Sequence, residues 1–262
     1  MPDQQKYIKK LAGDRVLVIG GSAGIGYGVA EACVEEGCFV IITGSSPRSS
    51  QAALTKLQSS YPSATARLSA FAADLADEDN LEGNISTLFE SVSKLLTDGV
   101  LDHVVYTAGD ALSVLPLSDV TLAKAKQAGM VRFFAPLLVA KHALPFLTRS
   151  AKGSLTLTTG GVASKPSANW TVVGSYATAL LGLTRQLALD MRPVRVNAVA
   201  PGAVDTGLWK GLTAEQKEEM EKKTATGRVG VVEDVAQTYL GILKDRNTTG
   251  SVVETNSGYL LM

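Results

Sequence analysis

Residues 16–26 of this chain are Val16-Leu17-Val18-Ile19-Gly20-Gly21-Ser22-Ala23-Gly24-Ile25-Gly26. The first four form a short apolar, β-branched run, which is typical of a buried strand. Glycines follow it directly, permit a tight turn, and let the backbone N–H groups of a helix N-terminus approach a pyrophosphate. The stretch therefore predicts a strand–turn–helix unit that binds a dinucleotide. The predicted contacts are Gly20, Ser22, Ala23, Gly24, Ile25 and Gly26.

The same alternation of apolar runs and amphipathic stretches continues along the chain. Continuous apolar strands that are joined by helical crossovers indicate a parallel sheet covered on both faces. We see no repeat, linker or low-complexity tract, and we predict a single doubly wound α/β domain over residues 1–262, with a mostly parallel seven-stranded sheet. The predicted strands are Val16–Ile19, Phe39–Ile42, Leu68–Ala72, His103–Tyr106, Leu155–Thr158, Val194–Val199 and Val252–Val253.

Composition narrows the class of partner. The chain has 262 residues, and its 25 basic and 25 acidic residues are interspersed, which argues against a nucleic-acid surface. Met1 to Lys10 is polar, and no apolar run approaches the roughly 18 residues of a membrane span. We expect a cytoplasmic protein with a small-molecule partner, without nucleic acid or membrane.

Neither cysteines nor histidines predict a chemical site. Cys33 and Cys38 fall at a predicted helix end and in the following strand, where they are expected to be buried small residues and not a disulfide. His103 and His142 are far apart in the sequence and are expected to be ordinary strand and helix residues, so we predict no metal site.

One charged segment interrupts the alternation of predicted strands and helices. Gly211 to Arg228 is rich in Lys, Glu and Thr and is expected to be a helix flanked by loops. It can serve as a lid over the active site, or it can be a solvated surface helix. The sequence leaves both open.

The end of the second predicted strand bears on the choice of cofactor. Folds that prefer NAD usually place an acidic residue here to hold the ribose 2′-hydroxyl. This chain has Thr43-Gly44-Ser45-Ser46-Pro47-Arg48 instead. Ser45, Ser46 and Arg48 can hydrogen-bond and charge-pair with a 2′-phosphate, which predicts NADPH/NADP+ as cofactor. The alternative is an ordinary polar loop.

Over essentially its full length, the chain resembles the short-chain dehydrogenase/reductase family, whose fold is a Rossmann domain. The resemblance rests on several separate stretches. They are Gly20 to Gly26, Ala73-Asp74-Leu75, Thr107-Ala108-Gly109, Ala143-Leu144-Pro145, Gly182-Leu183-Thr184, and Arg195 to Thr206.

The resemblance also implies roles for individual residues. It places Asp74 and Leu75 at the adenine, although Asp74 can also be a helix N-cap. It implies a dimer or tetramer in which helices such as Met130 to Leu147 and Val173 to Met191 pack between subunits. The remaining implied cofactor contacts are Ala108, Gly109, Pro201, Gly202, Val204 and Thr206.

The resemblance fails at the catalytic tetrad. The family normally uses Asn, Ser, Tyr and Lys, with Tyr as the proton donor. In this chain the four positions are occupied by Arg132, Gly160, Val173 and Ala177. Tyr176 does not replace the missing Tyr, because the position four residues later is Leu180 and a Tyr without its Lys is a poor acid at neutral pH. Tyr176 is expected to pack or to touch substrate.

A site without a proton donor favours a particular chemistry. Reduction of a ketone produces an alkoxide that needs a proton, whereas hydride transfer to an iminium produces a neutral amine. We therefore expect an activated C=N⁺ substrate in a pocket that supplies shape, desolvation and a counter-charge. Candidate site residues are Asp110, Ser167, Asn169, Trp170, Tyr176 and Arg132.

Two of these candidates have structural alternatives. Trp170 can be an aromatic wall for a flat or cationic ligand, or it can be core packing. Arg132 can bind a substrate carbonyl or a cofactor phosphate, or it can form a surface ion pair on its helix.

A narrower resemblance concerns function. The retained NADP frame, Arg132, Trp170 and the lost Tyr and Lys are similar to the fungal reductase/Diels–Alderases of bicyclo[2.2.2]diazaoctane indole alkaloids. This similarity implies reduction of a cyclic iminium followed by an intramolecular [4+2] cycloaddition. Those proteins have an Asp near the Trp, where this chain has Ser167 and Asn169. A silent NADP(H)-binding sensor and a carbonyl reductase that uses Tyr176 or Asp110 as acid remain alternatives.

Overall fold

The structure is a computed structural model that describes residues 6–207 and 213–262. Its centre is one sheet of seven parallel strands in the order β3-β2-β1-β4-β5-β6-β7, which confirms the predicted fold class. The direction of strand addition reverses between β1 and β4, and ligands of such sheets bind at the carboxyl ends of strands at this point. The strands are β1 (Arg15–Ile19), β2 (Phe39–Gly44), β3 (Leu68–Ala72), β4 (His103–Tyr106), β5 (Ser154–Thr158), β6 (Arg195–Pro201) and β7 (Val252–Thr255).

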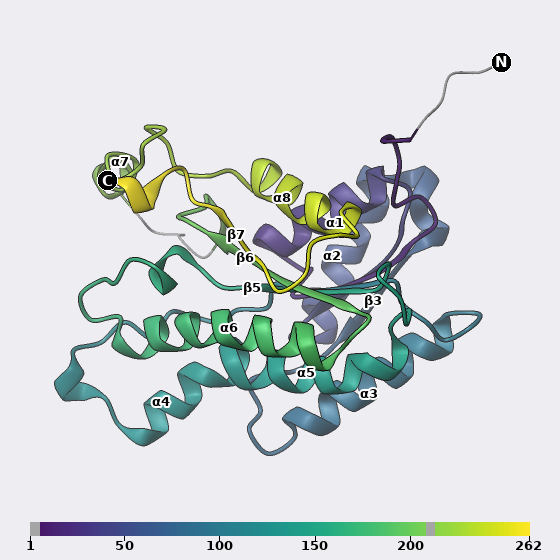
Figure 1. The fold of residues 1–262 in the computed structure, drawn as a ribbon, viewed down its shortest axis with the longest axis horizontal. Helices are drawn as coiled ribbons and strands as arrows, with labels where there is room; N and C mark the ends of the chain where they lie inside the picture. Colours follow the sequence, from purple (N-terminus) through teal and green to yellow (C-terminus); the bar gives the residue numbers. More distant parts are fainter. Residues whose placement is uncertain (1–5, 208–212) are drawn as a thin grey trace.

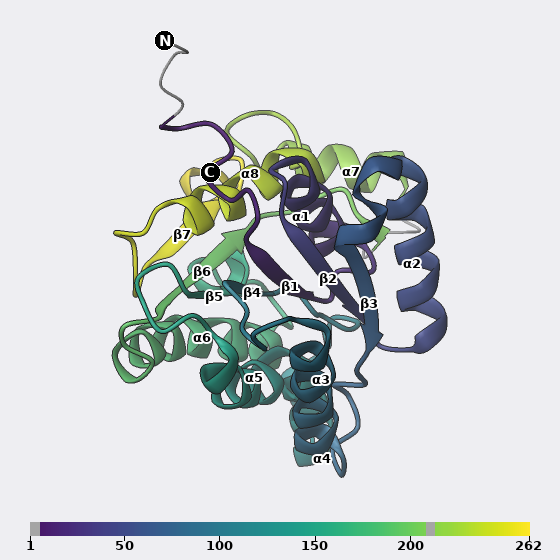
Figure 2. The same ribbon diagram turned by 90° about the vertical axis from the view of Figure 1, so that its right-hand side faces the viewer.

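Helices cover both faces of the sheet (Figures 1 and 2). Helices α1, α2 and α8 pack on one face, and α3, α5 and α6 pack on the other. The helices are α1 (Gly24–Glu35), α2 (Pro47–Ser60), α3 (Leu81–Leu95), α4 (Leu122–Gly129), α5 (Ala135–Ala143), α6 (Thr171–Asp190), α7 (Ala214–Glu221) and α8 (Val232–Lys244). Shorter helical segments are Pro62–Arg67, Leu117–Asp119, Met130–Phe134, Leu144–Phe146, Gly161–Ala163 and Tyr259–Leu261.

The apolar strands are explained by this double cover. Successive side chains of a strand point to opposite faces. Leu17 and Ile19 therefore enter the core beneath α3, α5 and α6, whereas Val16 and Val18 enter the core beneath α1 and α8. All four side chains are fully buried. Because both faces are covered, the strand has no polar alternation.

The predicted helix from Met130 to Leu147 is divided in the structure. Met130–Phe134 is a π-helix, Ala135–Ala143 is α5, and Leu144–Phe146 is a 3₁₀ turn. Pro136 lies in the first turn of α5 and has no N–H, so it cannot donate the α-helical hydrogen bond to the carbonyl four residues earlier. The prediction of one uniform helix was wrong for this reason.

Helix α7 lies within the segment predicted to hold a charged helix. Thr213 caps α7 in a capping box with Gln216, and each side chain bonds the other residue's backbone N–H. Gly211 and Leu212, the first residues of that predicted segment, lie outside the described residues. Whether α7 acts as a lid stays a prediction.

The two cysteines are buried and free, as predicted. In the described ranges, no helix is both long and apolar enough to span a bilayer.

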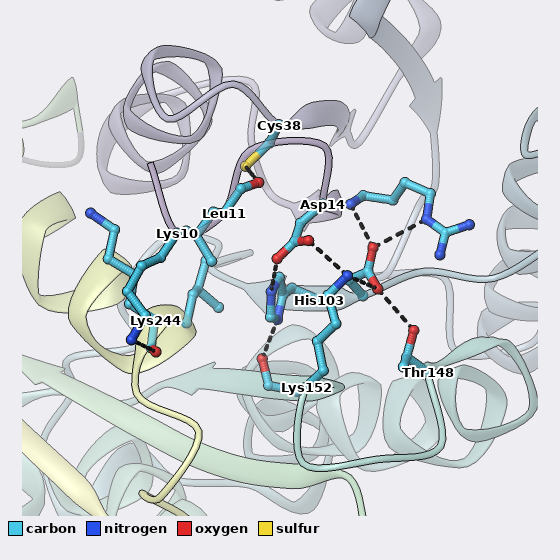
Figure 3. A network of polar contacts seen from close by, with 12 residues as sticks. Lys10, Leu11, Asp14, Cys38, His103, Thr148, Lys152 and Lys244 are labelled. Carbon is cyan, nitrogen blue, oxygen red and sulfur yellow. Dashed lines mark hydrogen bonds and ion pairs between the residues drawn. The ribbon is translucent and has the colours of Figure 1, made fainter. Parts of the chain in front are cut away.

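A buried ionic network lies at the edge of the sheet where β1, β4 and β5 begin (Figure 3). Lys152 Nζ lies 2.8 Å from Asp14 Oδ1 and 3.0 Å from Asp102 Oδ1. The side chain of Asp102 is 2% exposed, and it also accepts hydrogen bonds from Thr148 and from the backbone and side chain of Arg15. The network therefore joins three neighbouring strands at the end opposite the glycine turn.

His103 belongs to the same network. Its Nδ1 lies 2.8 Å from Ser154 Oγ and its Nε2 lies 3.3 Å from Asp14 Oδ2. Burial lowers the pKa of His103, although Asp14 opposes that shift. The residue was predicted to be an ordinary strand residue. Its place in a buried ionic network was missed because its partners are distant in the sequence.

Burial alone would raise the pKa of Asp102, but hydrogen bonds from Arg15, Lys152 and Thr148 outweigh it and hold the pKa well below its ordinary value. We predict that Asp102→Asn lowers the free energy of unfolding at pH 7 by about 3 kcal/mol, because it removes the buried negative charge that accepts hydrogen bonds from Arg15 and Thr148 and pairs with Lys152. Since the folded-state pKa is depressed, this stabilisation is present above the unfolded pKa of about 4 and is lost as the pH falls below it. Urea denaturation at pH 7 and at pH 3 measures both effects.

The control is Glu78→Gln, which removes an exposed ion pair with Lys126. It should cause a much smaller loss at either pH, because exposed pairs contribute little. Equal losses for the two variants would contradict the role given to the network.

Candidate active site

The glycine turn brings the carboxyl ends of β1 and β4 into backbone contact. Gly20 has φ +87°, and a β-carbon there would lie 2.5 Å from the backbone nitrogen of Ala108. A β-carbon on Gly26 would overlap the Gly20 carbonyl oxygen and Thr107 Oγ1. Thr107 Oγ1 in turn donates to the Ile19 carbonyl at 3.0 Å. Only glycine at both positions lets these segments approach so closely.

The N-terminus of α1 offers donors to an anion. The helix begins at Gly24, and its N-cap residue Ala23 provides no side-chain hydrogen bond to the first turn. A β-carbon on Gly24 would lie 3.5 Å from Thr206, and one on Gly44 would lie 3.0 Å from Ser22 Oγ. The predicted contacts Ser22, Gly24 and Thr206 therefore lie around this turn, next to the end of β2 at Gly44. Its backbone donors and dipole suit a pyrophosphate.

The loop that ends β2 has a structural role of its own. Ser46 is the N-cap of α2 and forms a capping box with Ser49. The Ser46 hydroxyl already accepts a hydrogen bond from the Ser49 N–H. Ser45 and Arg48 are exposed and stay accessible to a ligand at this end of β2.

Asp74 and Leu75 follow β3. Leu75 is buried, whereas Asp74 is exposed and accepts a hydrogen bond from the Ala76 N–H at 2.9 Å. The alternative that Asp74 is a helix N-cap was wrong, because α3 begins at Leu81 with Asn80 as its N-cap. Asp74 instead closes an Asx turn.

The residues that follow β6 lie at the same carboxyl-end edge of the sheet as the glycine turn. A β-carbon on Gly202 would approach the Asn256 Cα to 2.8 Å, so this backbone is packed against the segment that follows β7. Val204 is buried and pairs with Gly230 in an isolated bridge. Pro201 ends β6. These residues are therefore held firmly next to the turn at Gly24.

A cavity of about 560 Å³ opens beside Gly109. The loop after β4 contributes most of the lining, and Trp170, the N-cap residue of α6, contributes to it as well. Trp170 therefore lines a pocket and is not plain core packing. The lining residues are Gly109, Asp110, Ala111, Leu112, Val114, Trp170 and Gly207.

Arg132 and Asp110 form an ion pair at this pocket. Arg132 Nε lies 3.0 Å from Asp110 Oδ1, and Nη2 donates to the Asp110 backbone carbonyl. A β-carbon on Gly109 would lie 3.4 Å from two guanidinium nitrogens, so the guanidinium lies along the backbone of this loop. The guanidinium is thus ion-paired with the Asp110 carboxylate and hydrogen-bonded to its backbone carbonyl. Binding of Arg132 to a substrate carbonyl or a cofactor phosphate stays a prediction.

The π-helix explains the position of Arg132. Arg132 is the central residue of Met130–Phe134, and such single turns widen the helix at functional sites. The buried Tyr106 at the end of β4 donates its hydroxyl to the carbonyl of Val131. Burial, and then the negative charge of Asp110, raise the pKa of Tyr106. This tyrosine supports the π-helix and is no proton donor to the pocket.

Tyr176 is not among the residues that line the pocket. A β-carbon on Gly129 would stand 2.5 Å from the Tyr176 ring, and the rings of Phe133 and Phe134 lie 5.5 and 6.1 Å from it. The residue packs α6 against α4 and the π-helix. This placement agrees with the packing alternative.

The loop before α6 carries three candidate site residues, of which Trp170 lines the pocket and Ser167 and Asn169 do not. Ser167 and Asn169 are exposed and are not among the lining residues. Asn169 has φ +66°, and its backbone carbonyl accepts from the Leu115 N–H at 3.0 Å. The structure therefore does not bring these two side chains together with Asp110 and Trp170.

The tetrad positions hold no acid. Val173 is buried in α6, and the Ala177 carbonyl accepts a hydrogen bond from Thr159 Oγ1 at 2.7 Å. The nearest atom to a β-carbon on Gly160 would be 3.8 Å away, so a side chain has room there but none is present. Of the described residues that line the pocket, none is a Tyr, Ser, Lys or His.

Sequence reasoning missed four lining residues. They are Ala111, Leu112, Val114 and Gly207. The first three lie in a loop without regular structure, where apolar residues have no periodicity to interpret. Their position directly after the Thr107-Ala108-Gly109 stretch was the only signal.

Comparison with known proteins assigns the family. The profile of the SDR-like Rossmann domain matches residues 7–262. The short-chain dehydrogenase/reductase fsr5 of Gibberella fujikuroi is 45% identical over 262 residues, with 98% of each chain covered. The chain belongs to the short-chain dehydrogenase/reductase family, a family of oxidoreductases.

Two solved structures of the family are also similar. The MalC Reductase/Diels-Alderase from Malbranchea aurantiaca is 39% identical with a TM-score of 0.90, over 97% of this chain and 99% of that one. A short chain dehydrogenase from Burkholderia cenocepacia in complex with NADP is 27% identical with a TM-score of 0.84, over 96% and 99%.

We predict that Gly26→Ala weakens dinucleotide binding by more than about tenfold and lowers the free energy of unfolding by about 2 kcal/mol, because the added methyl group has no room beside Gly20 and Thr107. Fluorescence titration with NADPH and urea denaturation measure the two effects. Gly241→Ala is the matched control: it lies in α8 with no atom within 4 Å of the added carbon and should be neutral or stabilising. Normal binding by Gly26→Ala would show that the close approach is not required.

Proposed function

We propose that this protein is an NADPH-dependent reductase whose small-molecule substrate carries an activated C=N⁺, such as a cyclic iminium. The observation that carries the proposal is the pocket lining. Among the described residues it combines apolar groups with one ion-paired carboxylate, Asp110, and lacks a proton donor. An ionised carboxylate accepts hydrogen bonds and donates none.

The reaction balances without an acid. Addition of a hydride to a ketone leaves a negative oxygen that must take a proton from the site. Addition of a hydride to C=N⁺ forms a C–H bond and returns the nitrogen to a neutral amine. A site with Val173 and Ala177 in place of Tyr and Lys is suited to the second reaction and poorly suited to the first.

Asp110 and Trp170 suit a cationic, planar group. The side chain of Asp110 is 34% exposed, and its carboxylate provides the negative charge in the lining. Arg132 fixes the position of this carboxylate, so the charge is preorganised before substrate binds. The indole of Trp170 also lines the cavity, and an aromatic ring attracts a cation placed over its face within about 6 Å.

NADPH is the proposed cofactor because the residues fit it. The α1 N-terminus and the glycine turn suit the pyrophosphate, and the end of β2 carries Arg48 and Ser45 where an acidic residue would repel a 2′-phosphate. A relative of the same fold is described in complex with NADP. When bound, NADPH supplies the hydride. The contacts at Asp74, Ala108, Pro201 and Thr206 are part of this proposal.

A following [4+2] cycloaddition is the finer part of the proposal. It is supported by the similarity to the MalC Reductase/Diels-Alderase. A cycloaddition needs diene and dienophile held in one orientation, which an apolar pocket provides without titrating groups. Leu112, Val114 and Trp170 provide apolar lining of this cavity.

The other two functions have less support. A sensor that only binds cofactor has no need for a cavity of about 560 Å³ beside Gly109. A carbonyl reductase needs an acid, and Tyr176 packs against Phe133 while Asp110 is paired with Arg132. A dimeric or tetrameric state and a cytoplasmic location stay predictions.

We expect the purified protein to oxidise NADPH with preformed cyclic iminium ions and not with simple ketones. The two panels are followed by absorbance at 340 nm, and products are analysed for cyclised species. A single cyclised enantiomer would support the cycloaddition. Turnover of ketones would refute the proposed substrate class, and tight NADPH binding without turnover of either panel would favour the sensor.

Two variants refine this test. Asp110→Asn keeps the shape of the side chain but removes its charge, and it should lower kcat/KM for the iminium by about tenfold or more. Tyr176→Phe removes a hydroxyl that lies beside Gly129 in α4, outside the pocket lining, and should have little effect. The opposite ranking would indicate that Tyr176 is the acid of a carbonyl reductase.

We predict that Arg48→Ala raises the Kd for NADPH by about tenfold and leaves the Kd for NADH unchanged, because only NADPH carries the 2′-phosphate. Fluorescence titration with both cofactors measures this. Lys56→Ala is the matched control, since Lys56 lies on the same helix but stacks over Tyr27 at 4.2 Å. An equal effect on both cofactors would place Arg48 elsewhere than at the 2′-phosphate.

A further inference from the structure

Asn169 has an unusual backbone conformation. Among the described residues, three that are not glycine have positive φ: Lys9, Asn169 and Ser257. Only Asn169, at φ +66°, directly precedes a residue that lines the pocket. Asparagine tolerates this left-handed region better than most residues, and a β-branched side chain does not.

The left-handed turn places one backbone hydrogen bond between two loops. The Leu115 N–H donates to the Asn169 carbonyl at 3.0 Å. Loop 107–116, which follows β4, and loop 159–170, which follows β5, otherwise share no hydrogen bond that the described residues form. Among the described residues, it is therefore the one hydrogen bond between the two loops.

This hydrogen bond connects the two loops that carry the pocket lining. Asp110, Leu112 and Val114 lie on the first loop, and Trp170 follows Asn169 on the second. These lining residues therefore stand on two segments that the Leu115–Asn169 hydrogen bond connects. The Asn169 side chain is exposed and does not line the cavity, and its amide has no hydrogen bond to another described residue.

We propose that Asn169 is a positioning residue that acts through its left-handed backbone and not through its amide, and that it holds Trp170 opposite Asp110 for a planar cationic substrate. The proposal rests on the proposed function for the identity of that substrate.

The test compares Asn169→Val with Asn169→Gly. Both remove the amide, but only glycine takes φ +66° without strain. In a Trp209→Phe background, acrylamide quenching of fluorescence reports Trp170 alone, since the sequence has two tryptophans. We expect Asn169→Val to increase the quenching constant about twofold and to raise the KM for the iminium about tenfold with a smaller change in kcat. Asn169→Gly should restore both values.

The Kd for NADPH controls for folding, because the cofactor residues lie on other segments. Asn169→Ala should shift both readouts in the same direction as valine by a smaller amount, and it serves if the valine variant does not fold. The proposal is overturned if Asn169→Val leaves the quenching and the KM as they were, or if glycine is as impaired as valine. Quenching needs no turnover, so a failure of the proposed iminium reaction is distinguishable from a failure of this inference.

Discussion

The backbone at Gly20 lies so close to Ala108 that a β-carbon on Gly20 would stand 2.5 Å from the Ala108 nitrogen. This contact joins the ends of β1 and β4, the two strands between which the direction of strand addition reverses. Because the two strand ends touch, the loop after β4 starts beside the N-terminus of α1. The cofactor end and the pocket wall at Gly109 and Asp110 are therefore parts of one backbone arrangement.

The two ends of β4 are stabilised differently. At its beginning, His103 and Asp102 lie in a buried ionic network with Lys152 and Asp14. At its end, the chain leaves the sheet and depends on the Arg132–Asp110 pair and on the Leu115 hydrogen bond. A buried charge that loses its partner is strongly unfavourable, so the network fixes the beginning of the strand. At the end of the strand, Tyr106 donates to the Val131 carbonyl and Thr107 to the Ile19 carbonyl, and the loop begins after these bonds. Binding loops on a rigid scaffold commonly have this design.

The sequence predicted all seven strands and the glycine turn because periodicity and glycine spacing are local properties. The π-helix at Met130–Phe134 was missed, although Pro136 was visible, because a proline alone does not tell a kink from a wider turn. The pairing of Arg132 with Asp110 and the role of His103 depend on residues that are distant in sequence. No single-sequence pattern marks the backbone angle of Asn169, since asparagine is common in loops of many conformations.

The replaced tetrad has a consistent physical meaning once the pocket is considered as a whole. A Tyr–Lys pair serves to deliver a proton, and its loss would leave an alkoxide without a partner. Here the lost donors coincide with a fixed carboxylate, Asp110, and an aromatic wall, Trp170. Both groups interact favourably with a positive charge, and neither has a proton to give. The proposed iminium substrate rests on this combination, because it begins as a cation and ends neutral when a hydride is added.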